Sequence, residues 1–385
     1  MAAARTLLFV FGTRPEAIKL APLVQAARAH GAFTVRVCVT AQHREMLDSV
    51  LAFFDIRPDF DLNLMRPGQS LTALTTGALD ALAPVLAAVR PQWTVVQGDT
   101  TTAFAAALAA FYAGVRVAHV EAGLRTGDAM QPFPEEMNRK LVGAIAGLHF
   151  PPTAAARANL LREGVHPGRI LVTGNTGIDA LYLVRERLRV DPACRALAHT
   201  ALAQHGLQRF LKAERPFVLV TAHRRESFGD GIDAICSAVG ELCARYAGTD
   251  FVFPVHPNPA VQRAVERRLA PLQIDNLVLC RPLDYLPFVA LLINAALVLT
   301  DSGGVQEEAP SLGKPVVVMR ELTERTEGQA SGMVHLAGPH RARIVGAVAS
   351  LLDSGAPQGS GGNFYGDGQA ARRIVAAFER YPDGA

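Results

Sequence analysis

Short apolar runs rich in β-branched residues alternate along the chain with longer segments whose apolar positions recur at helical spacing. The short runs predict buried strands and the longer segments predict helices. The predicted strands fall into two groups. The first group is Leu7–Phe11, Thr34–Val39, Trp93–Gln97, Arg116–Val120 and Ile170–Thr173. The second group is Phe217–Thr221, Phe251–Val255, Leu277–Cys280, Ala296–Thr300 and Pro315–Met319.

Strands that alternate with helices form right-handed βαβ units and parallel sheets buried on both faces. Two groups of such strands in 385 residues predict an α/β protein with two Rossmann-like, doubly wound domains. Their boundary is expected in the Arg/Ala-rich helical stretch between Asn175 and Arg215, and a Gly/Ser/Pro patch at 354–362 precedes a last helix, Gln369–Arg380. Because open α/β sheets bind ligands beyond the carboxyl ends of their strands, a cleft between the two domains is the expected site.

Composition narrows the class of protein. Half of the residues are hydrophobic and 19% are charged, which excludes disordered, collagen-like and coiled-coil chains. A net charge of +3 over this length is not the footprint of a nucleic-acid-binding protein. Only four of the 38 basic residues are lysines. Arginine suits phosphate and carboxylate ligands, although a general compositional bias also explains the preference.

The cysteines and the start of the chain exclude further classes. Five scattered cysteines without a CxxC pair favour neither a disulfide framework nor a zinc site. The opening MAAARTLLFVFGTRPE predicts a first strand rather than a signal peptide, because Gly12 and Pro15 interrupt the apolar run. The longest stretch of small apolar residues, Ala103 to Ala113, predicts a buried helix, and no run is expected to span a membrane. A cytoplasmic protein is therefore expected.

The end of the first predicted strand has the pattern of a capped helix start. Thr13 and Glu16 form a T-x-x-E capping box with Pro15 in the first turn. A helix N-terminus that faces a cleft favours an anion, and Arg14 and Lys19 add positive charge. An ordinary capped helix with solvated basic residues explains the same pattern equally well.

Carboxylates follow the next strands of the first group. Asp99 and Glu121 each come directly after a predicted strand, so both belong to the same edge of the sheet. Asp99 alone is also typical of a helix cap, whereas Glu is a poor cap. Glu135 and Glu136 follow on a proline-rich turn, where two acids at a helix start are the alternative interpretation.

The second half brings basic residues to its strand ends. His223, Arg224 and Arg225 follow one predicted strand, a combination that suits a negatively charged ligand and proton handling. His256 follows the next strand, but a structural or regulatory role is the first interpretation in a chain with 11 histidines.

The strongest local pattern is TDSGGVQEEA from Thr300, which predicts a strand, a Gly-Gly turn and a helix start. Ser302, Gly303 and Gly304 let backbone N–H groups approach a diphosphate closely, and Glu308 within the helix can accept ribose hydroxyls. The pattern lacks the GxxxxGK[ST] of P-loop NTPases and the GxGxxG of dinucleotide-binding proteins. A tight turn without a ligand is the alternative interpretation.

Ordered blocks along nearly the whole chain carry a family resemblance. They are FGTRPEAIKLAPL from Phe11, TAQHREML from Thr40, MRPGQSL from Met65, GDTTT from Gly98, HVEAGLRTGD from His119, PEEMNR from Pro134, TGNTGIDAL from Thr173, HRRESFG from His223, PVHPNP from Pro254, TDSGGVQEEAPSLGKPV from Thr300, TER from Thr323 and YGDGQA from Tyr365. In these blocks the chain resembles the non-hydrolysing UDP-N-acetylglucosamine 2-epimerases. TAQHRE favours the UDP-GlcNAc enzymes over relatives that act on diacetamido-uronic acid sugars.

The resemblance implies an architecture. It implies a glycosyltransferase-B-like fold with an N-terminal domain at 1–178, a UDP-binding domain at 179–364, and a C-terminal helix at 365–385 that returns to the first domain. It also implies a homodimer and neither a metal nor a nicotinamide cofactor.

The resemblance also assigns site residues. The implied catalytic residues are Asp99, Glu121, Glu135 and His223. The implied substrate contacts are Arg14, Lys19, Phe288, Ser302, Gly303, Gly304, Glu308 and Arg325. A second substrate molecule activates many bacterial members, and Gln42, His43, Arg66 and His256 are the candidates for its site. The chain departs from the family pattern at Ala222, Thr326 and Phe364, and Thr326 puts the loop that carries Arg325 in doubt.

The implied reaction inverts C2 of a sugar whose C2 proton no carbonyl acidifies. UDP leaves C1 while a base removes the C2 proton, and reprotonation of 2-acetamidoglucal from the other face followed by return of UDP gives UDP-ManNAc. Asp99, Glu121 and Glu135 would serve as acids and bases, and His223 would stabilise departing oxygens. A glycosyltransferase, a hydrolysing relative that releases free N-acetylmannosamine, and a non-catalytic nucleotide-sugar sensor are the alternatives.

Overall fold

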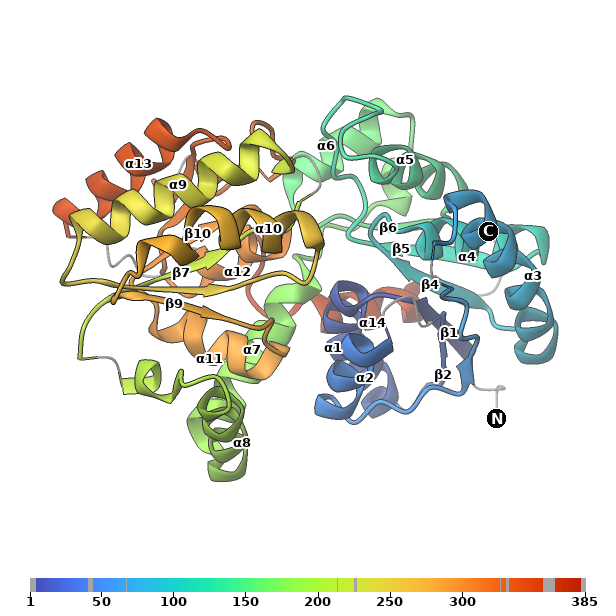
Figure 1. Cartoon of the computed structure of the whole chain (residues 1–385). Coiled ribbons are helices and arrows are strands. Elements are labelled where there is room, and N and C mark those ends of the chain that lie inside the picture. Colours follow the sequence, from blue (N-terminus) through green and yellow to red (C-terminus); the bar gives the residue numbers. More distant parts are fainter. Residues whose placement is uncertain are drawn as a thin grey trace. The chain divides into compact units, whose positions relative to one another are not determined.

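The computed structural model describes residues 5–40, 44–66, 68–212, 214–224, 227–325, 327–329, 332–355 and 364–381. The chain forms two compact units, one made of Met1–Ala180 and Tyr365–Ala385 and the other of Leu181–Phe364 (Figure 1). The chain thus leaves the first unit once, completes the second, and returns to the first with its last helix.

The first unit is built on a six-stranded parallel sheet in the order β3-β2-β1-β4-β5-β6. Its strands are β1 (Arg5–Phe11), β2 (Phe33–Val39), β3 (Phe60–Asp61), β4 (Trp93–Gln97), β5 (Arg116–Val120) and β6 (Leu148–Phe150). Its helices are α1 (Arg14–His30), α2 (Arg44–Phe53), α3 (Leu71–Val89), α4 (Thr101–Tyr112), α5 (Glu135–Ile145), α6 (Ala154–Arg162), the 3₁₀ turn η1 (Pro167–Arg169) and α14 (Ala370–Arg380). The helix α7 (Thr176–Val190) begins in this unit and ends in the other.

The second unit repeats the same plan with the order β12-β11-β10-β7-β8-β9. Its strands are β7 (Phe217–Thr221), β8 (Asp250–Pro254), β9 (Leu277–Cys280), β10 (Leu297–Thr300), β11 (Val316–Val318) and β12 (Val334–Leu336). Its helices are α8 (Pro192–Ala203), α9 (Asp230–Arg245), α10 (Pro259–Arg268), α11 (Tyr285–Asn294), α12 (Gly303–Ser311) and α13 (Arg341–Asp353), with 3₁₀ turns at Gln208–Lys212 and Ala270–Leu272.

Both sheets have the strand order 3-2-1-4-5-6 when each is numbered along its own chain segment. The order reverses between β1 and β4 in the first sheet and between β7 and β10 in the second. These switch points are where doubly wound sheets bind ligands. The predicted fold class is confirmed. Motifs that lie near these two switch points are the candidates for ligand binding.

Most predicted strands are confirmed within one residue at each end, but one is wrong. Ile170–Thr173 forms no strand, since Ile170 makes a single isolated bridge to His149. The edge position belongs to β6, whose three residues are too short a run to stand out in the sequence. The sequence also gave no signal for the two-residue β3 and the three-residue β12.

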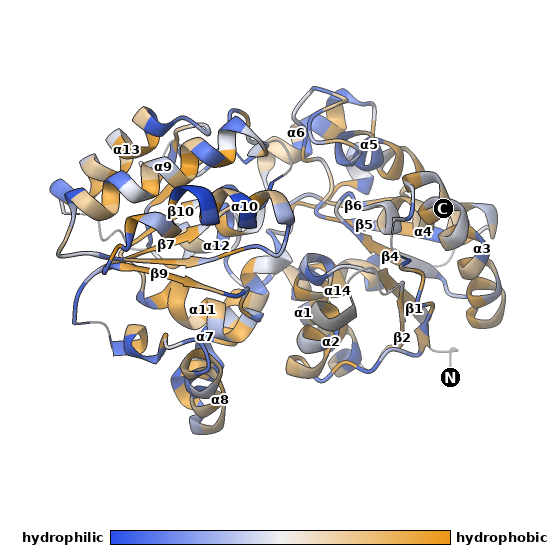
Figure 2. Cartoon of the chain, in the orientation of Figure 1, coloured by the Kyte–Doolittle hydropathy of each residue, from blue (hydrophilic) through white to orange (hydrophobic). Residues whose placement is uncertain are grey.

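The strands form the apolar interior of each unit, and the helices turn polar faces outward (Figure 2). In the first unit α4 contributes almost only alanines to the core, which lets it pack closely on the sheet. In the second unit α9 and α13 pack together over one sheet face. The last helix, α14, packs on α1 and inserts Phe378 among Phe33, Trp93 and Phe150.

The helix α3 corrects the expectation that no segment reaches the length of a membrane span. Among the residues that the structure describes, this 19-residue helix is long and apolar enough by length and composition, and 28% of its most apolar window is buried. It packs along α4 and carries Asp80 near its middle. Length and composition carry little weight here, because core helices of soluble proteins pass the same test.

Candidate active site

The loop after β1 is organised by the predicted capping box, which the structure confirms. The Glu16 carboxylate accepts hydrogen bonds from the backbone N–H groups of Gly12 (3.1 Å) and Thr13 (2.8 Å) and from the Thr13 hydroxyl (2.7 Å). Arg14, the first residue of α1, is half-buried at this loop. The loop is therefore held in one conformation from inside the protein.

The same carboxylate also holds the loop after β4. Its second oxygen accepts a hydrogen bond of 2.7 Å from the hydroxyl of Thr100. Burial raises the pKa of Glu16, and the hydrogen bonds from Thr100 and Thr13 oppose that shift. Because β1 and β4 flank the switch point, Glu16 ties together the two loops that border it. The sequence analysis assigned Glu16 only a capping role.

Asp99 lies in this second loop and is not a helix cap. The cap of α4 is Thr100, whose hydroxyl accepts a hydrogen bond from the Ala103 backbone N–H at 3.0 Å. The Asp99 carboxylate is instead ion-paired with Arg139, and its backbone carbonyl accepts a hydrogen bond from the Asn138 amide at 2.9 Å. The structure thus excludes the interpretation of Asp99 as a helix cap. Residues of α5 hold its side chain and its backbone in place.

Glu121, directly after β5, is the most constrained carboxylate of the first unit. Its backbone is left-handed, with φ of 63°, a conformation that costs energy for any residue except glycine. The Lys19 ammonium lies 2.6 and 2.7 Å from its two carboxylate oxygens. The side-chain amides of Gln97 and Asn175 also donate to this carboxylate, the latter at 3.1 Å. Strain at a charged, nearly buried residue is typical of functional sites.

The two acids of the proline-rich turn have different surroundings. Glu136 is fully buried, accepts backbone hydrogen bonds from Thr126 and Gly127 at 3.2 Å each, and lies 3.4 Å from the Arg139 guanidinium. Glu136 is therefore structural. Glu135 is half-buried and opens α5. Because Asn138 and Arg139 bind Asp99, the first turn of α5 is fixed near the loop after β4.

In the second unit His223 follows β7 and Asp301 follows β10, on the two sides of the switch point. The imidazole Nδ1 of His223 lies 3.2 Å from the Asp301 carboxylate, which is completely buried. His256 stacks on His223 with ring centroids 5.5 Å apart and planes at 26°. Its own Nδ1 accepts a hydrogen bond from the Asn258 backbone N–H at 3.2 Å.

The Gly-Gly turn is confirmed as the start of α12, with Ser302 as its N-cap. A Cβ atom on Gly303 would lie 2.8 Å from the Arg325 guanidinium and 3.2 Å from that of Arg224, whereas one on Gly304 would meet nothing within 4 Å. Two guanidinium groups therefore lie against the N-terminal turn of α12, where the helix dipole also favours an anion.

Arg325 is held firmly, although Thr326, which follows it in the sequence, departs from the family pattern. It is buried and ion-paired with Glu324 and with Glu307, the latter at 2.6 Å. Glu308 is buried and accepts a hydrogen bond of 3.0 Å from the Tyr285 hydroxyl, and Phe288 is buried one turn further along α11. These residues belong to one cluster around α12.

The remaining candidates of the sequence analysis are Arg66 and three residues that the structure does not describe. Arg66 is exposed in the loop before α3. Gln42, His43 and Thr326 lie outside the described residues. Across the described part of the chain, no group of three or more His, Cys, Asp or Glu side chains is arranged to hold a metal ion.

Sequence reasoning missed the residues that support the candidates. Arg139, Gln97, Asn175 and Asp301 each bind a candidate side chain or its backbone. Arg139, Asn175 and Asp301 stand inside quoted motifs, and this is the only signal that the sequence offers for them. Their partners are 40, 54 and 78 residues away along the chain.

Comparison with known proteins now adds to this geometry. The family model described as UDP-N-acetylglucosamine 2-epimerase matches residues 25–379. A UDP-N-acetylglucosamine 2-epimerase of Yersinia pestis is 53% identical over 97% of this chain and 98% of its own, and one of Escherichia coli K12 is 51% identical over 97% and 98%.

Solved structures agree in fold. The crystal structure of UDP-GlcNAc 2-epimerase from Neisseria meningitidis bound to UDP-GlcNAc superposes with a TM-score of 0.92 at 43% identity, covering 98% of this chain and all of that one. The Methanocaldococcus jannaschii enzyme in complex with UDP-GlcNAc and UDP gives 0.84 at 31% identity, with the same coverage. The family model covers most of the chain, and these relatives match it over nearly its full length, so the chain belongs to the UDP-N-acetylglucosamine 2-epimerase family of isomerases.

Proposed function

We propose that the protein interconverts UDP-GlcNAc and UDP-ManNAc without hydrolysis, by eliminating UDP to form 2-acetamidoglucal and adding it back. The observation that carries this proposal is the arrangement at the edge of the first sheet. Asp99 and the strained Glu121 follow neighbouring strands, and Lys19 contacts Glu121 directly. The relatives solved with UDP-GlcNAc support the choice of substrate.

In this proposal the first unit supplies the acids and bases. Inversion at C2 requires one group to remove the proton and another to return it to the opposite face, so more than one carboxylate is needed. Asp99 and Glu121 come from different strands, and Glu135 comes from α5, so the three can approach a sugar from different directions. Lys19 keeps the charge of Glu121 compensated while the sugar is absent.

The second unit would hold the nucleotide. The N-terminal turn of α12, with Arg224 and Arg325 beside Gly303, offers backbone donors and positive charge to a diphosphate. Ser302 and Gly304 complete the turn, and Glu308 in the same helix would accept ribose hydroxyls. His223 would donate to an oxygen of the leaving group, which becomes more negative as the bond to C1 breaks.

One experiment separates this proposal from its alternatives. The protein is incubated with UDP-GlcNAc in D₂O and the sugar is followed by NMR at C2. Deuterium at C2 in a mixture of UDP-GlcNAc and UDP-ManNAc is the expected result. Free N-acetylmannosamine would establish the hydrolysing reaction instead. A sugar that stays protonated at C2 would overturn the proposal and leave a glycosyltransferase or a nucleotide-sugar sensor.

The proposal includes activation by a second substrate molecule. The stacking of His256 on His223 supports it, because a ligand that contacts His256 would act on His223 through the ring contact. Arg66, exposed in the loop before α3, is a further candidate for contact with this second molecule. The proposal also places the enzyme in the cytoplasm, where UDP-ManNAc would supply surface polysaccharide synthesis. Sigmoidal dependence of the rate on UDP-GlcNAc, lost in His256→Ala, is the expected result.

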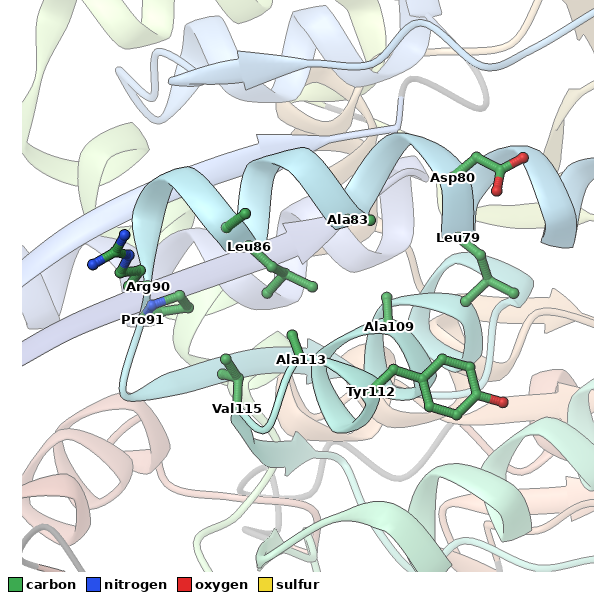
Figure 3. Close-up of a pocket in the computed structure, with 11 residues that line it drawn as sticks. Leu79, Asp80, Ala83, Leu86, Arg90, Pro91, Ala109, Tyr112, Ala113 and Val115 are labelled. Atoms are coloured by element: carbon green, nitrogen blue, oxygen red, sulfur yellow. The ribbon is translucent and has the colours of Figure 1, made fainter.

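The proposal further includes a homodimer formed through α3 and α4. A groove of about 890 Å³ lies between these helices, with Leu79, Ala83, Leu86 and Val115 among its lining residues (Figure 3). At the end of α4, Phe111 and Tyr112 are 60% and 73% exposed. A second copy would cover the side chains of Phe111 and Tyr112, which otherwise face water.

Light scattering tests the dimer directly. Phe111→Glu is expected to shift the molar mass from about twice that of the 41.0 kDa chain to that of one chain, because it buries a charge in the contact. Leu197→Glu is the matched control, since Leu197 is 63% exposed on α8 of the other unit. A wild-type protein of one chain's mass, or a Phe111→Glu variant that stays dimeric, would contradict this placement.

A further inference from the structure

Asp301 is the fully buried carboxylate at the switch point of the second sheet. Its Oδ2 accepts two backbone hydrogen bonds, from His223 N–H at 2.7 Å and from Arg224 N–H at 2.8 Å. Its Oδ1 lies 3.2 Å from Nδ1 of the His223 ring. One side chain after β10 therefore holds both the backbone and the ring of a residue after β7.

The two carboxylate oxygens of Asp301 have different partners, and this difference indicates more than a structural role. Oδ2 alone satisfies the two backbone N–H groups, so the turn after β7 needs nothing more from Asp301. Oδ1 is buried and accepts no hydrogen bond of good geometry from the described residues, and the nearby cationic group is the His223 imidazole. A buried acceptor left without a strong donor costs about 1–3 kcal/mol. That cost is recovered when the imidazole carries a proton on Nδ1.

The strand ends on both sides hold this arrangement rigid. Thr221 and Thr300 face each other across β7 and β10, and their hydroxyls are hydrogen-bonded at 2.5 Å. The Ser302 backbone N–H donates to the Thr300 hydroxyl at 2.9 Å, which connects Asp301 to the start of α12. The His223 ring, about one third exposed, is packed on one face by His256.

We propose that Asp301 is a positioning residue for catalysis, which fixes His223 with a proton on Nδ1 and presents Nε2 to the substrate. This inference rests on the proposed function of His223. In the imidazolium form, a small rotation of the ring would align Nδ1–H with Asp301 Oδ1, 3.2 Å away, and Nε2–H would donate to an oxygen of the departing diphosphate. The Asp301 carboxylate then stabilises the positive ring, as a buried carboxylate does behind an acid–base histidine.

The test begins with Asp301→Asn, which keeps an oxygen for the two backbone N–H groups but turns an NH₂ toward Nδ1. That change forces Nδ1 to accept and removes the carboxylate charge. We expect kcat to fall by about 10²–10³-fold, with KM within about threefold of wild type. Asp284→Asn, a change at the cap of α11 in the same unit, is the matched control and should leave kcat within about twofold.

A double-mutant cycle separates positioning from general structural damage. In the His223→Gln background, Asp301→Asn is expected to change kcat by less than about threefold, because the group it acts through is gone. A wild-type kcat in Asp301→Asn, or the full loss repeated in the His223→Gln background, would overturn the inference.

A spectroscopic measurement on the wild-type protein tests the inference even if Asp301→Asn does not fold. The ¹⁵N signals of the His223 imidazole, identified by their loss in His223→Gln, should report a proton on Nδ1 in the wild-type protein. A neutral ring protonated on Nε2 alone would refute the inference. If wild-type protein fails to exchange C2 of UDP-GlcNAc in D₂O, the proposed function fails separately, and the ¹⁵N signals still decide the Asp301–His223 pair.

Discussion

The two units share one strand order but use carboxylates in opposite ways. At the edge of the first sheet, the carboxylates of Asp99 and Glu121 are held by two cations, Arg139 and Lys19, and by an amide, and in the proposed reaction these acids transfer the protons. At the edge of the second sheet, Asp301 and Glu307 are buried and hold His223 and Arg325. There, in the proposed function, the basic side chains contact the ligand.

The difference shows what the doubly wound sheet contributes. It brings two strand ends together at a switch point in both units, and this contribution is the same for each. The more exposed partner is the acid in the Asp99–Arg139 pair (28% against 4%) and the base in the His223–Asp301 pair (35% against 0%). One architecture therefore carries an acidic edge in the first unit and a basic edge in the second, and the proposed reaction needs both.

The largest expected effect comes from removing the charge of the acids in the first unit. Asp99→Asn or Glu121→Gln should lower kcat by about 10²–10⁴-fold, because an amide neither removes nor returns the C2 proton. Steady-state rates with UDP-GlcNAc measure this effect. Glu379→Gln, which changes an exposed carboxylate on α14, is the control. A near-normal rate in either variant would remove that residue from the acid–base set.

A smaller effect is expected at the basic edge, from the glycines of α12. Gly303→Ala puts a methyl group within 2.8 Å of the Arg325 guanidinium, so Arg325 must move away from Glu307. We expect a loss of about 1–3 kcal/mol of stability and about tenfold weaker UDP binding. Thermal unfolding and calorimetric titration with UDP measure both.

Gly304→Ala provides the matched comparison, because a Cβ atom there meets nothing within 4 Å. Its stability should stay within about 0.5 kcal/mol of wild type, whatever it does to UDP binding. Equal destabilisation by the two variants would show that the guanidinium groups do not press on Gly303.

The effect that is smallest at neutral pH is the pH dependence of the stability of the first unit. Burial lowers the pKa of His119 to about 3, while the unfolded chain keeps a value near 6.5. As the pH falls below about 6.5 the unfolded chain takes up a proton that the folded chain does not. Wild-type protein should therefore lose up to about 1.4 kcal/mol per pH unit relative to His119→Gln, which does not titrate.

Urea unfolding followed by the fluorescence of Trp93 measures this difference, because Trp93 is the single tryptophan of the chain and lies in the first unit. Glutamine can still donate to the Gly98 carbonyl, which His119 contacts at 2.8 Å. If the two proteins show parallel stability curves between pH 7 and pH 4, burial does not control the protonation of His119.

The sequence was sufficient for the parts of the fold that depend on local pattern. Runs such as Trp93–Gln97 and Phe217–Thr221 have β-branched or aromatic residues at four of their five positions, and both strands are confirmed to the residue. The strands β3, β6 and β12 have only two or three residues, and their positions come from pairing with a neighbour. Ile170–Thr173 has strand-like residues but pairs at one position only.

The same limit applies to the candidate site. Asp99, Glu121 and Ser302 could be identified as candidates from the sequence alone, because they follow predicted strands or precede the Gly-Gly turn. The side chains that fix them come from elsewhere in the fold, as Arg139 does for Asp99 and Lys19 for Glu121. No local pattern states which distant residue will be buried next to a carboxylate. Contacts of that kind are decided by tertiary packing.

The return of the chain to its first unit has a consequence for the order of folding. Residues 181–364 are nested within the first unit, so the second unit is synthesised in full before α14 exists. Phe378 fills the space between Phe33, Trp93 and Phe150, and the Asp179 carboxylate accepts the backbone N–H groups of Ala370 and Ala371 at 3.2 and 2.8 Å. On the ribosome, the unit encoded later is therefore the first to be complete. The core of the first sheet, which carries the acidic edge, is complete only after α14 has been synthesised and has packed against it.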